Sequence, residues 1–245
     1  MSIRKHIPNT ITSLNLACGT LGVVSVAFGR VDAAFALMLA GAVFDFFDGL
    51  SARALGAYSP MGKELDSIAD TVTFGLLPAF MLFKTLFSTY GANEFFVWIP
   101  LLIAVFSGLR LAKFNIDERQ TSSFIGLPTP ACAMVCGSLA CALAVCPETA
   151  FATIALKPWF IPALSVLMCA LLVCEIPMFS MKMHKGEGLN RDMVLRIVFA
   201  GITLVGLVTV IVAGWHWTIA FFLAFTAYIL INMVAAVCAP KKTEE

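Results

Sequence analysis

Long apolar segments separated by short polar breaks follow one another along the whole chain. A helix rises about 1.5 Å per residue, so segments of about 20 residues match the hydrocarbon thickness of a membrane. The segments lack the alternation of about ten residues that is typical of membrane strands. In lipid, only helices and closed barrels satisfy every backbone hydrogen bond. The pattern therefore predicts an all-α, polytopic membrane helix bundle with about eight transmembrane helices, at residues 11–29, 32–55, 62–88, 95–117, 128–146, 159–180, 193–213 and 216–238.

The breaks contain the residues expected of turns and membrane interfaces. Residues 29–32 end the first segment, and Trp215 and Trp217 stand at a boundary where aromatic side chains are common. The first segment is longer than the apolar core of a cleaved signal peptide, which has about 7–15 residues. It also contains Asn15 and Gly19. We therefore predict that it is retained as the first transmembrane helix, in a chain with no soluble domain.

Composition supports the membrane prediction. Of the 245 residues, 60% are hydrophobic and 13% are charged, whereas soluble domains average about 25% charged residues. The mean hydropathy is +0.93. A net charge of +1 gives no sign of nucleic-acid binding. The eight cysteines lie within apolar segments without a C-x-x-C pair, so we interpret them as small packing residues.

The basic residues predict the orientation of the helices. With eight spans, both termini lie on the same side of the membrane, together with 13 of the 16 lysines and arginines. Cytoplasmic loops carry an excess of basic residues. We therefore expect a protein of the cytoplasmic membrane whose termini and candidate site face the cytoplasm. The opposite side would hold Arg30, Lys84 and Lys157.

Four aspartates interrupt the apolar pattern between residues 45 and 70, in the arrangement D-x-x-D-G-x-x-A-R-x8-G-x3-D-x3-D. Helical periodicity places Asp45 and Asp48 on one face of the second helix, and Asp66 and Asp70 on one face of the third. A short loop joins these helices, so the two pairs are expected to meet. Ionisable groups are costly inside a membrane and are therefore candidates for function.

Four carboxylates in a low-dielectric site cannot all ionise without cations. Oxygen ligands without nearby histidine or thiolate favour Mg²⁺, Mn²⁺ or Ca²⁺. Such ions suit a substrate that carries phosphates. Two alternatives do not involve catalysis. One is a buried salt-bridge network, although Arg53 alone cannot balance four aspartates. The other is an ion or proton pathway in an ion-coupled membrane transporter.

This spacing resembles the signature of the CDP-alcohol phosphatidyltransferase family, with every defined position filled. The resemblance implies that a CDP-linked lipid donates its phosphatidyl group to an alcohol, and that CMP leaves. It implies a six-helix core, to which eight spans would add two, and a polar cavity open to the cytoplasm. It further implies two divalent ions, Mg²⁺ or Mn²⁺ with Ca²⁺ as a substitute. Asp45, Asp48 and Asp66 would hold them, with Asp70 also reaching a metal and acting as the general base.

The same resemblance implies a binding site for the cytidine diphosphate of the donor lipid. The matching positions are Asp45, Gly49, Ala52, Arg53 and Gly62. Glycine and alanine let a ligand lie close to a helix, and arginine offers a planar fork to phosphate. Asn9, Thr12 and Asn15 in the first span would either line this pocket or cap and pack the helix.

Two further stretches indicate the acceptor alcohol. Residues 8–15, with Gly19, and the strings R-L-A-K-F-N at 110–115 and F-I-G-L-P-T-P at 124–130 are similar to membrane-type phosphatidylserine synthases. The similarity covers about residues 7–185, the expected catalytic core of one integral-membrane domain spanning 1–245, with a two-helix part at about 190–240. It implies CDP-diacylglycerol, L-serine and membrane lipids as partners, and a homodimer.

Serine is a zwitterion and needs charged or polar groups to hold it. Arg110, Lys113 and Asn115 are the candidates, and Lys113 stands where arginine is more usual. The alternative interpretation is that they anchor the helix at the cytoplasmic interface. Glycerol 3-phosphate or an inositol phosphate would be the competing acceptors.

Overall fold

The computed structural model describes residues 6–117, 124–178 and 191–237. Two antiparallel helices begin the chain, α1 (His6–Ala27) and α2 (Val31–Leu55), and they pack against each other along their length. Gly56 ends α2 in the left-handed region, with φ +57°. The next helix runs unbroken over Pro60–Tyr90. It consists of α3 (Pro60–Asp70), a π-helical segment η2 (Thr71–Leu76) and α4 (Leu77–Tyr90).

The start of α3 follows from its sequence. Ser59 is the N-cap, and its hydroxyl accepts a hydrogen bond from the Gly62 backbone N–H at 3.0 Å. Pro60 occupies the first turn, where the missing backbone N–H costs little. Together these residues define where the third helix leaves the short loop after α2.

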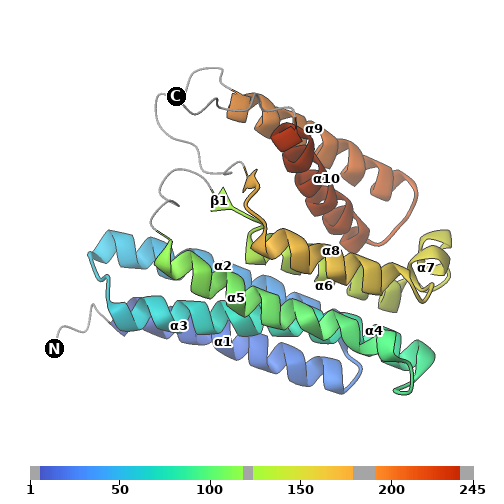
Figure 1. Ribbon diagram of the computed structural model, residues 1–245, viewed down its shortest axis with the longest axis horizontal. Coiled ribbons are helices and arrows are strands. Elements are labelled where there is room, and N and C mark those ends of the chain that lie inside the picture. The colour runs from blue at the N-terminus through green and yellow to red at the C-terminus, as the bar shows by residue number, and fades with distance from the viewer. Residues whose placement is uncertain (1–5, 118–123, 179–190, 238–245) are drawn as a thin grey trace.

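The second half begins with the 3₁₀ segment η3 (Phe95–Leu101) and α5 (Leu102–Ile116), followed by α6 (Thr129–Val145), the short α7 (Ala150–Ala155) and α8 (Phe160–Val173). The chain ends with α9 (Arg191–Val212) and α10 (Trp217–Val237). In Figure 1, α1 to α8 form the larger, lower part of the bundle, and α9 and α10 lie together above it. Helix α6 is buried along most of its length and packs against α4 on one side and α10 on the other.

A two-residue antiparallel pair is the exception to the helical architecture among the described residues. Strand β1 (Phe124–Ile125) pairs with β2 (Pro177–Met178). Gly126 follows β1 with φ +78°, and a Cβ there would lie 2.8 Å from the Cys174 carbonyl oxygen. The backbone N–H of Gly126 donates to Ile176 O, and that of Leu127 to Leu171 O, both at 2.9 Å. This pair ties the α5–α6 connection to the end of α8.

Helices occupy all eight predicted ranges, but the count of eight spans is not confirmed. Within the described residues, six helices are long and apolar enough to cross a membrane, which supports an integral membrane protein. The other two, α6 and α8, have 17 and 14 residues. At 1.5 Å per residue they reach roughly 26 and 21 Å, short of the hydrocarbon thickness of about 30 Å.

Two predicted helix ends were wrong. The sixth helix ends at Val173 and not at 180, because Pro177 restricts the residue before it to extended backbone and β2 takes up the pairing with β1. The first helix begins at His6 instead of residue 11. Pro8 lies in its first turn, where proline is tolerated, so residues 6–10 extend the helix.

Candidate active site

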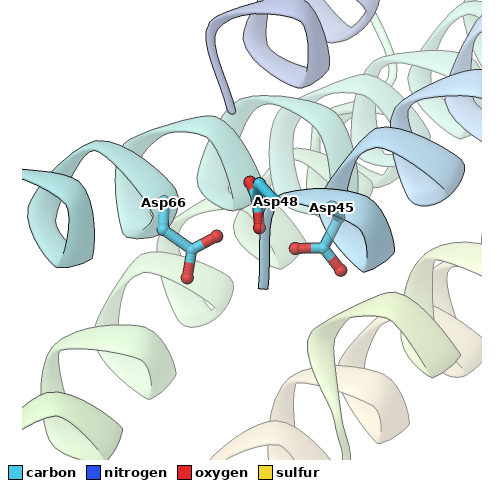
Figure 2. Close-up of side chains that lie close together, drawn as sticks. All are labelled: Asp45, Asp48 and Asp66. Carbon is cyan, nitrogen blue, oxygen red and sulfur yellow. The ribbon is translucent and has the colours of Figure 1, made fainter. Parts of the chain in front are cut away.

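Three of the four aspartates converge between α2 and α3. Asp45 and Asp48 come from α2 and Asp66 from α3, and each offers a carboxylate oxygen that lies within 4.8 Å of the other two. Figure 2 shows the three side chains turned toward a common space between the helices. Asp48 is only 7% exposed. The antiparallel arrangement of the two helices thus gathers residues that periodicity places on two separate helix faces.

The fourth aspartate, Asp70, lies one turn further along the third helix. Its carboxyl lies next to that of Asp45, and it is 9% exposed. The Nδ2 of Asn15 on α1 donates to Asp70 Oδ1 at 3.3 Å. The π-helical segment η2 begins directly after Asp70, and such segments are frequent at functional sites.

The cluster fits a divalent cation. Asp48 Oδ2 and Asp66 Oδ1 are buried and have no hydrogen-bond partner among the described residues. Leaving a buried charged acceptor unpaired costs more than the roughly 1–3 kcal/mol of a neutral group. The convergent ligands are all carboxylate oxygens, which suit hard cations such as Mg²⁺, Mn²⁺ or Ca²⁺. A bound cation would satisfy these oxygens and reduce the repulsion between the carboxylates.

A cavity of about 500 Å³ opens beside the cluster. The first turns of α1, the last turns of α2, residues 57–59 and the beginning of α3 form its walls. Asp48 and Asp66 line it as well, so the cavity and the cluster form one continuous site. The other lining residues are Pro8, Asn9, Thr12, Gly49, Ala52, Ala57, Tyr58, Ser59, Pro60, Gly62 and Lys63.

The structure brings five of the predicted donor-binding residues into this cavity, namely Asn9, Thr12, Gly49, Ala52 and Gly62. A Cβ at Gly62 would lie 2.9 Å from Asn9 Oδ1 and 3.0 Å from Ser59 Oγ, so a larger residue would fill the cavity. The side chain of Thr12 lies next to Asp48, and its hydroxyl donates to the Pro8 carbonyl at 3.0 Å.

Two other predicted donor-binding residues lie beside the cavity. Asp45 belongs to the aspartate cluster. Arg53 is exposed in the last turn of α2. Its Nη1 lies 3.9 Å from where a Cβ of Gly49 would be. The guanidinium therefore stands at the rim of the cavity.

Arg110 lies close to the opposite end of the aspartate site. It is 7% exposed, and its Nη1 donates to Thr129 Oγ1 at 3.0 Å. Asp70 and Tyr228 are electrostatic neighbours of its guanidinium. The Arg110 Nε is buried and has no hydrogen-bond partner among the described residues. A buried cation with a free donor therefore lies near the aspartate that was predicted to be the base.

The other two predicted acceptor-binding residues make different contacts. Lys113 forms an ion pair with Glu175 at 3.2 Å, with side chains that are 42% and 64% exposed. The side-chain Nδ2 of Asn115 donates to Ser67 Oγ at 2.8 Å. The backbone carbonyl of Asn115 accepts from Lys63 Nζ at 2.9 Å. Neither contact involves an aspartate of the cluster, so their role in binding an acceptor stays a prediction.

Several site residues were not singled out by the sequence patterns. Tyr58, Ser59 and Lys63 line the cavity, and Thr129 and Tyr228 flank Arg110. Asn15 was noticed, but not its contact with Asp70. The sequence did contain a signal that this face of α1 packs against the site. The buried residues of α1 recur at steps of three and four and are mostly polar or small. They are Pro8, Thr12, Asn15, Gly19, Gly22 and Val26.

Residues 5–175 match the family model described as CDP-alcohol phosphatidyltransferase. The chain belongs to this family. The match includes all four aspartates, the cavity and Arg110. It ends before α9 and α10, so the last two helices lie outside the family region.

Curated relatives carry more specific names. The chain is 38% identical over 125 residues to the CDP-diacylglycerol–serine O-phosphatidyltransferase of Bacillus subtilis, an alignment that covers 51% of the chain and 70% of the relative. It is 35% identical over 136 residues to the enzyme of that name from Methanocaldococcus jannaschii, with 55% and 61% covered. It is 31% identical over 134 residues to the archaetidylserine synthase of Methanothermobacter thermautotrophicus, with 54% and 56% covered. The chain thus spans less than two thirds of the two archaeal relatives.

Proposed function

We propose that the protein transfers the phosphatidyl group of CDP-diacylglycerol to the hydroxyl of L-serine, which gives phosphatidylserine and CMP. One observation carries the proposal: carboxylates from two helices converge within 4.8 Å at the end of a cavity of about 500 Å³. The names of the relatives support serine as the acceptor. In the reaction the serine oxygen attacks the lipid-bearing phosphorus, and the bond from this phosphorus to the oxygen of CMP breaks.

The cavity would hold the cytidine diphosphate end of the donor. Asn9 and Thr12 offer polar groups from α1, and Gly49, Ala52 and Gly62 leave room for the ligand against α2 and α3. Arg53 at the rim would bind a phosphate oxygen through its planar fork. These residues position the phosphorus next to the aspartates, and positioning accounts for much of the catalysis in phosphoryl transfer.

Asp45, Asp48, Asp66 and Asp70 would hold two divalent ions, Mg²⁺ or Mn²⁺, with Ca²⁺ able to take their place. When bound, these ions neutralise the diphosphate and the departing CMP. The aspartates provide the negative charge that attracts the ions. Asp48 Oδ2 and Asp66 Oδ1, which are buried without hydrogen-bond partners, are the best candidates for metal ligands.

Asp70 would accept the proton of the serine hydroxyl as the general base. Arg110 would bind the serine carboxylate, since its Nε donor is free among the described residues and Asp70 is its neighbour. Lys113 and Asn115 would complete the acceptor site by exchanging their present partners, Glu175 and Ser67, for serine. A phosphate-bearing acceptor would instead require several cations beside the cluster.

An assay of purified protein in detergent micelles tests this function. CDP-diacylglycerol is supplied with serine, glycerol 3-phosphate or inositol 1-phosphate, and CMP release is followed with Mn²⁺, with Mg²⁺ or in excess EDTA. We expect CMP release with serine that EDTA abolishes and a divalent ion restores. Full activity in excess EDTA would contradict the role of the aspartates. Use of glycerol 3-phosphate without serine would contradict the acceptor, and absence of any CMP release would favour a transporter.

We further propose that the site and both termini face the cytoplasm, on the basis of the 13 basic residues among 16 on that side. A reporter fused after Glu245 should then be cytoplasmic, and one inserted at Glu94 should not. Both reporters on the same side would contradict this topology. A homodimer is expected from the family resemblance, and the mass of the protein–detergent complex measures it.

A further inference from the structure

Three helices meet unusually closely behind the aspartate site. Gly19 of α1 packs directly against Thr73 of η2. Gly41 of α2 faces the same residue, and a Cβ at Gly41 would lie 2.6 Å from Thr73 Cγ2 and 2.9 Å from Asn15 Oδ1. Small residues allow such contact between membrane helices. Asn15, which is 0% exposed, lies at the centre of this junction.

Asn15 contacts the third helix at two points, one after the signature and one at its last aspartate. Its backbone carbonyl accepts a hydrogen bond from Thr73 Oγ1 at 3.0 Å, and its side-chain Nδ2 donates to Asp70 Oδ1 at 3.3 Å. The first contact holds the backbone of η2 against α1. The second reaches the carboxylate itself, across 55 residues of sequence.

The direction of the second contact has a chemical consequence. An amide N–H is a donor only, so it cannot take up a proton from Asp70 Oδ1. The contact therefore holds this oxygen without serving as a proton path. It also restricts rotation of the carboxyl group. The direction in which the carboxyl group of Asp70 faces therefore depends on Asn15.

We propose that Asn15 is a positioning residue that orients the Asp70 carboxylate toward the acceptor hydroxyl. The inference rests on the proposed function, in which Asp70 is the general base. It assigns to α1 a part in the chemical step, in addition to its place in the wall of the donor cavity. A base held in the wrong orientation loses its reactive geometry even when both substrates are bound.

The experiment compares two variants that each remove one contact of residue 15. Asn15→Leu keeps the shape of the side chain and removes the donor to Asp70. Thr73→Val keeps the shape of its side chain and removes the donor to the Asn15 carbonyl. Steady-state kinetics with CDP-diacylglycerol and serine, and thermal unfolding, are measured for both. We expect Asn15→Leu to lower kcat about 10- to 100-fold, with both KM values within about 3-fold of the wild type. Thr73→Val should lower the melting temperature but leave kcat within about 3-fold of the wild type.

A double-mutant comparison separates positioning from a merely structural role. Asp70→Asn alone should lower turnover at least about 100-fold. If Asn15 acts through Asp70, adding Asn15→Leu to Asp70→Asn should change turnover by less than about 3-fold. Asn15→Ala, which relieves any crowding in the junction, replaces Asn15→Leu if the latter does not fold.

Three results would overturn the inference. One is an unchanged kcat for Asn15→Leu in a wild-type background that is active. Another is a full further loss in the Asp70→Asn background, which would show that Asn15 acts independently of Asp70. An inactive wild-type protein would refute the proposed function, and this inference with it.

Discussion

Gly41 of α2 and Gly206 of α9 both lie in long apolar helices, yet their surroundings differ. A Cβ at Gly41 would overlap Thr73 and Asn15, whereas the nearest atom to a Cβ at Gly206 would be Leu223 Cβ at 4.0 Å. The whole helices show the same contrast. In the helix Pro60–Tyr90, 56% of the apolar window is buried, against 6% in Met193–Val212 of α9. The junction that holds Asn15 and Thr73 is therefore closely packed, whereas α9 is loosely packed around Gly206.

The last helix pair is not uniform. Helix α9 contacts mainly α10, while α10 also packs against α6 and β2. Tyr228 of α10 is 4% exposed and is an electrostatic neighbour of Arg110. The last helix pair, which lies outside the family region, therefore reaches Arg110 through α10, while α9 faces outward.

The largest effect is expected for the aspartate cluster. Asp66→Asn removes one negative charge from the proposed metal site and should lower CMP release more than about 100-fold, because a bound divalent ion would contribute several kcal/mol of transition-state stabilisation. Glu64→Gln, on an exposed position of the same helix, is the matched control and should stay near the wild type. Equal losses in the two variants would show a general sensitivity of α3 to charge and no specific cluster.

Arg110→Ala tests the acceptor end of the site. It removes the proposed charge-assisted contact to the serine carboxylate, worth about 1.5–3 kcal/mol, or roughly 10- to 150-fold in kcat/KM for serine. The KM for CDP-diacylglycerol should change much less. Unchanged serine kinetics would return Arg110 to a structural role beside Thr129.

A pair of glycine substitutions tests the contrast in packing. Gly41→Ala should destabilise the protein by about 1–3 kcal/mol, because the added methyl group overpacks the junction of α1, α2 and η2. Gly206→Ala should lie within about 0.5 kcal/mol of the wild type. Denaturant unfolding in detergent measures both. Equal destabilisation would show that α9 is packed as tightly as α2.

The smallest effect is expected for Tyr228→Phe. It removes one hydroxyl near Arg110 and keeps the ring that packs against Phe199. Loss of a single hydrogen bond, about 0.5–1.5 kcal/mol, should lower serine kcat/KM roughly 2- to 10-fold. Leu230→Ala, on an exposed position of the same helix, is the control. If both variants behave like the wild type, α10 supports the fold without acting on the site.

Local patterns in the sequence were sufficient for much of the fold and part of the site. Apolar segments located the helices. A membrane-spanning helix needs about 20 consecutive apolar residues, and within lipid the helix forms all of its backbone hydrogen bonds internally. Helical periodicity placed Asp45 with Asp48, and Asp66 with Asp70, because residues three or four apart share a face. The fixed spacing of the signature then identified the family, which the match over residues 5–175 shows.

Contacts between distant residues were decided by the tertiary structure. Asn15 meets Asp70 across 55 residues, Arg110 meets Thr129 across 19, and Lys113 meets Glu175 across 62. Periodicity states which face a residue occupies but not which helix that face meets. The end of α8 was also decided by a contact between distant residues. The sequence pattern predicted a helix to residue 180, but the helix ends at Val173 and β2 pairs with β1. The helices, the helix faces that carry the aspartates and the family follow from the sequence, because each depends on residues close together in the chain. Which side chains contact Asp70 depends on the close packing of α1, α2 and η2, which Gly19 and Gly41 allow.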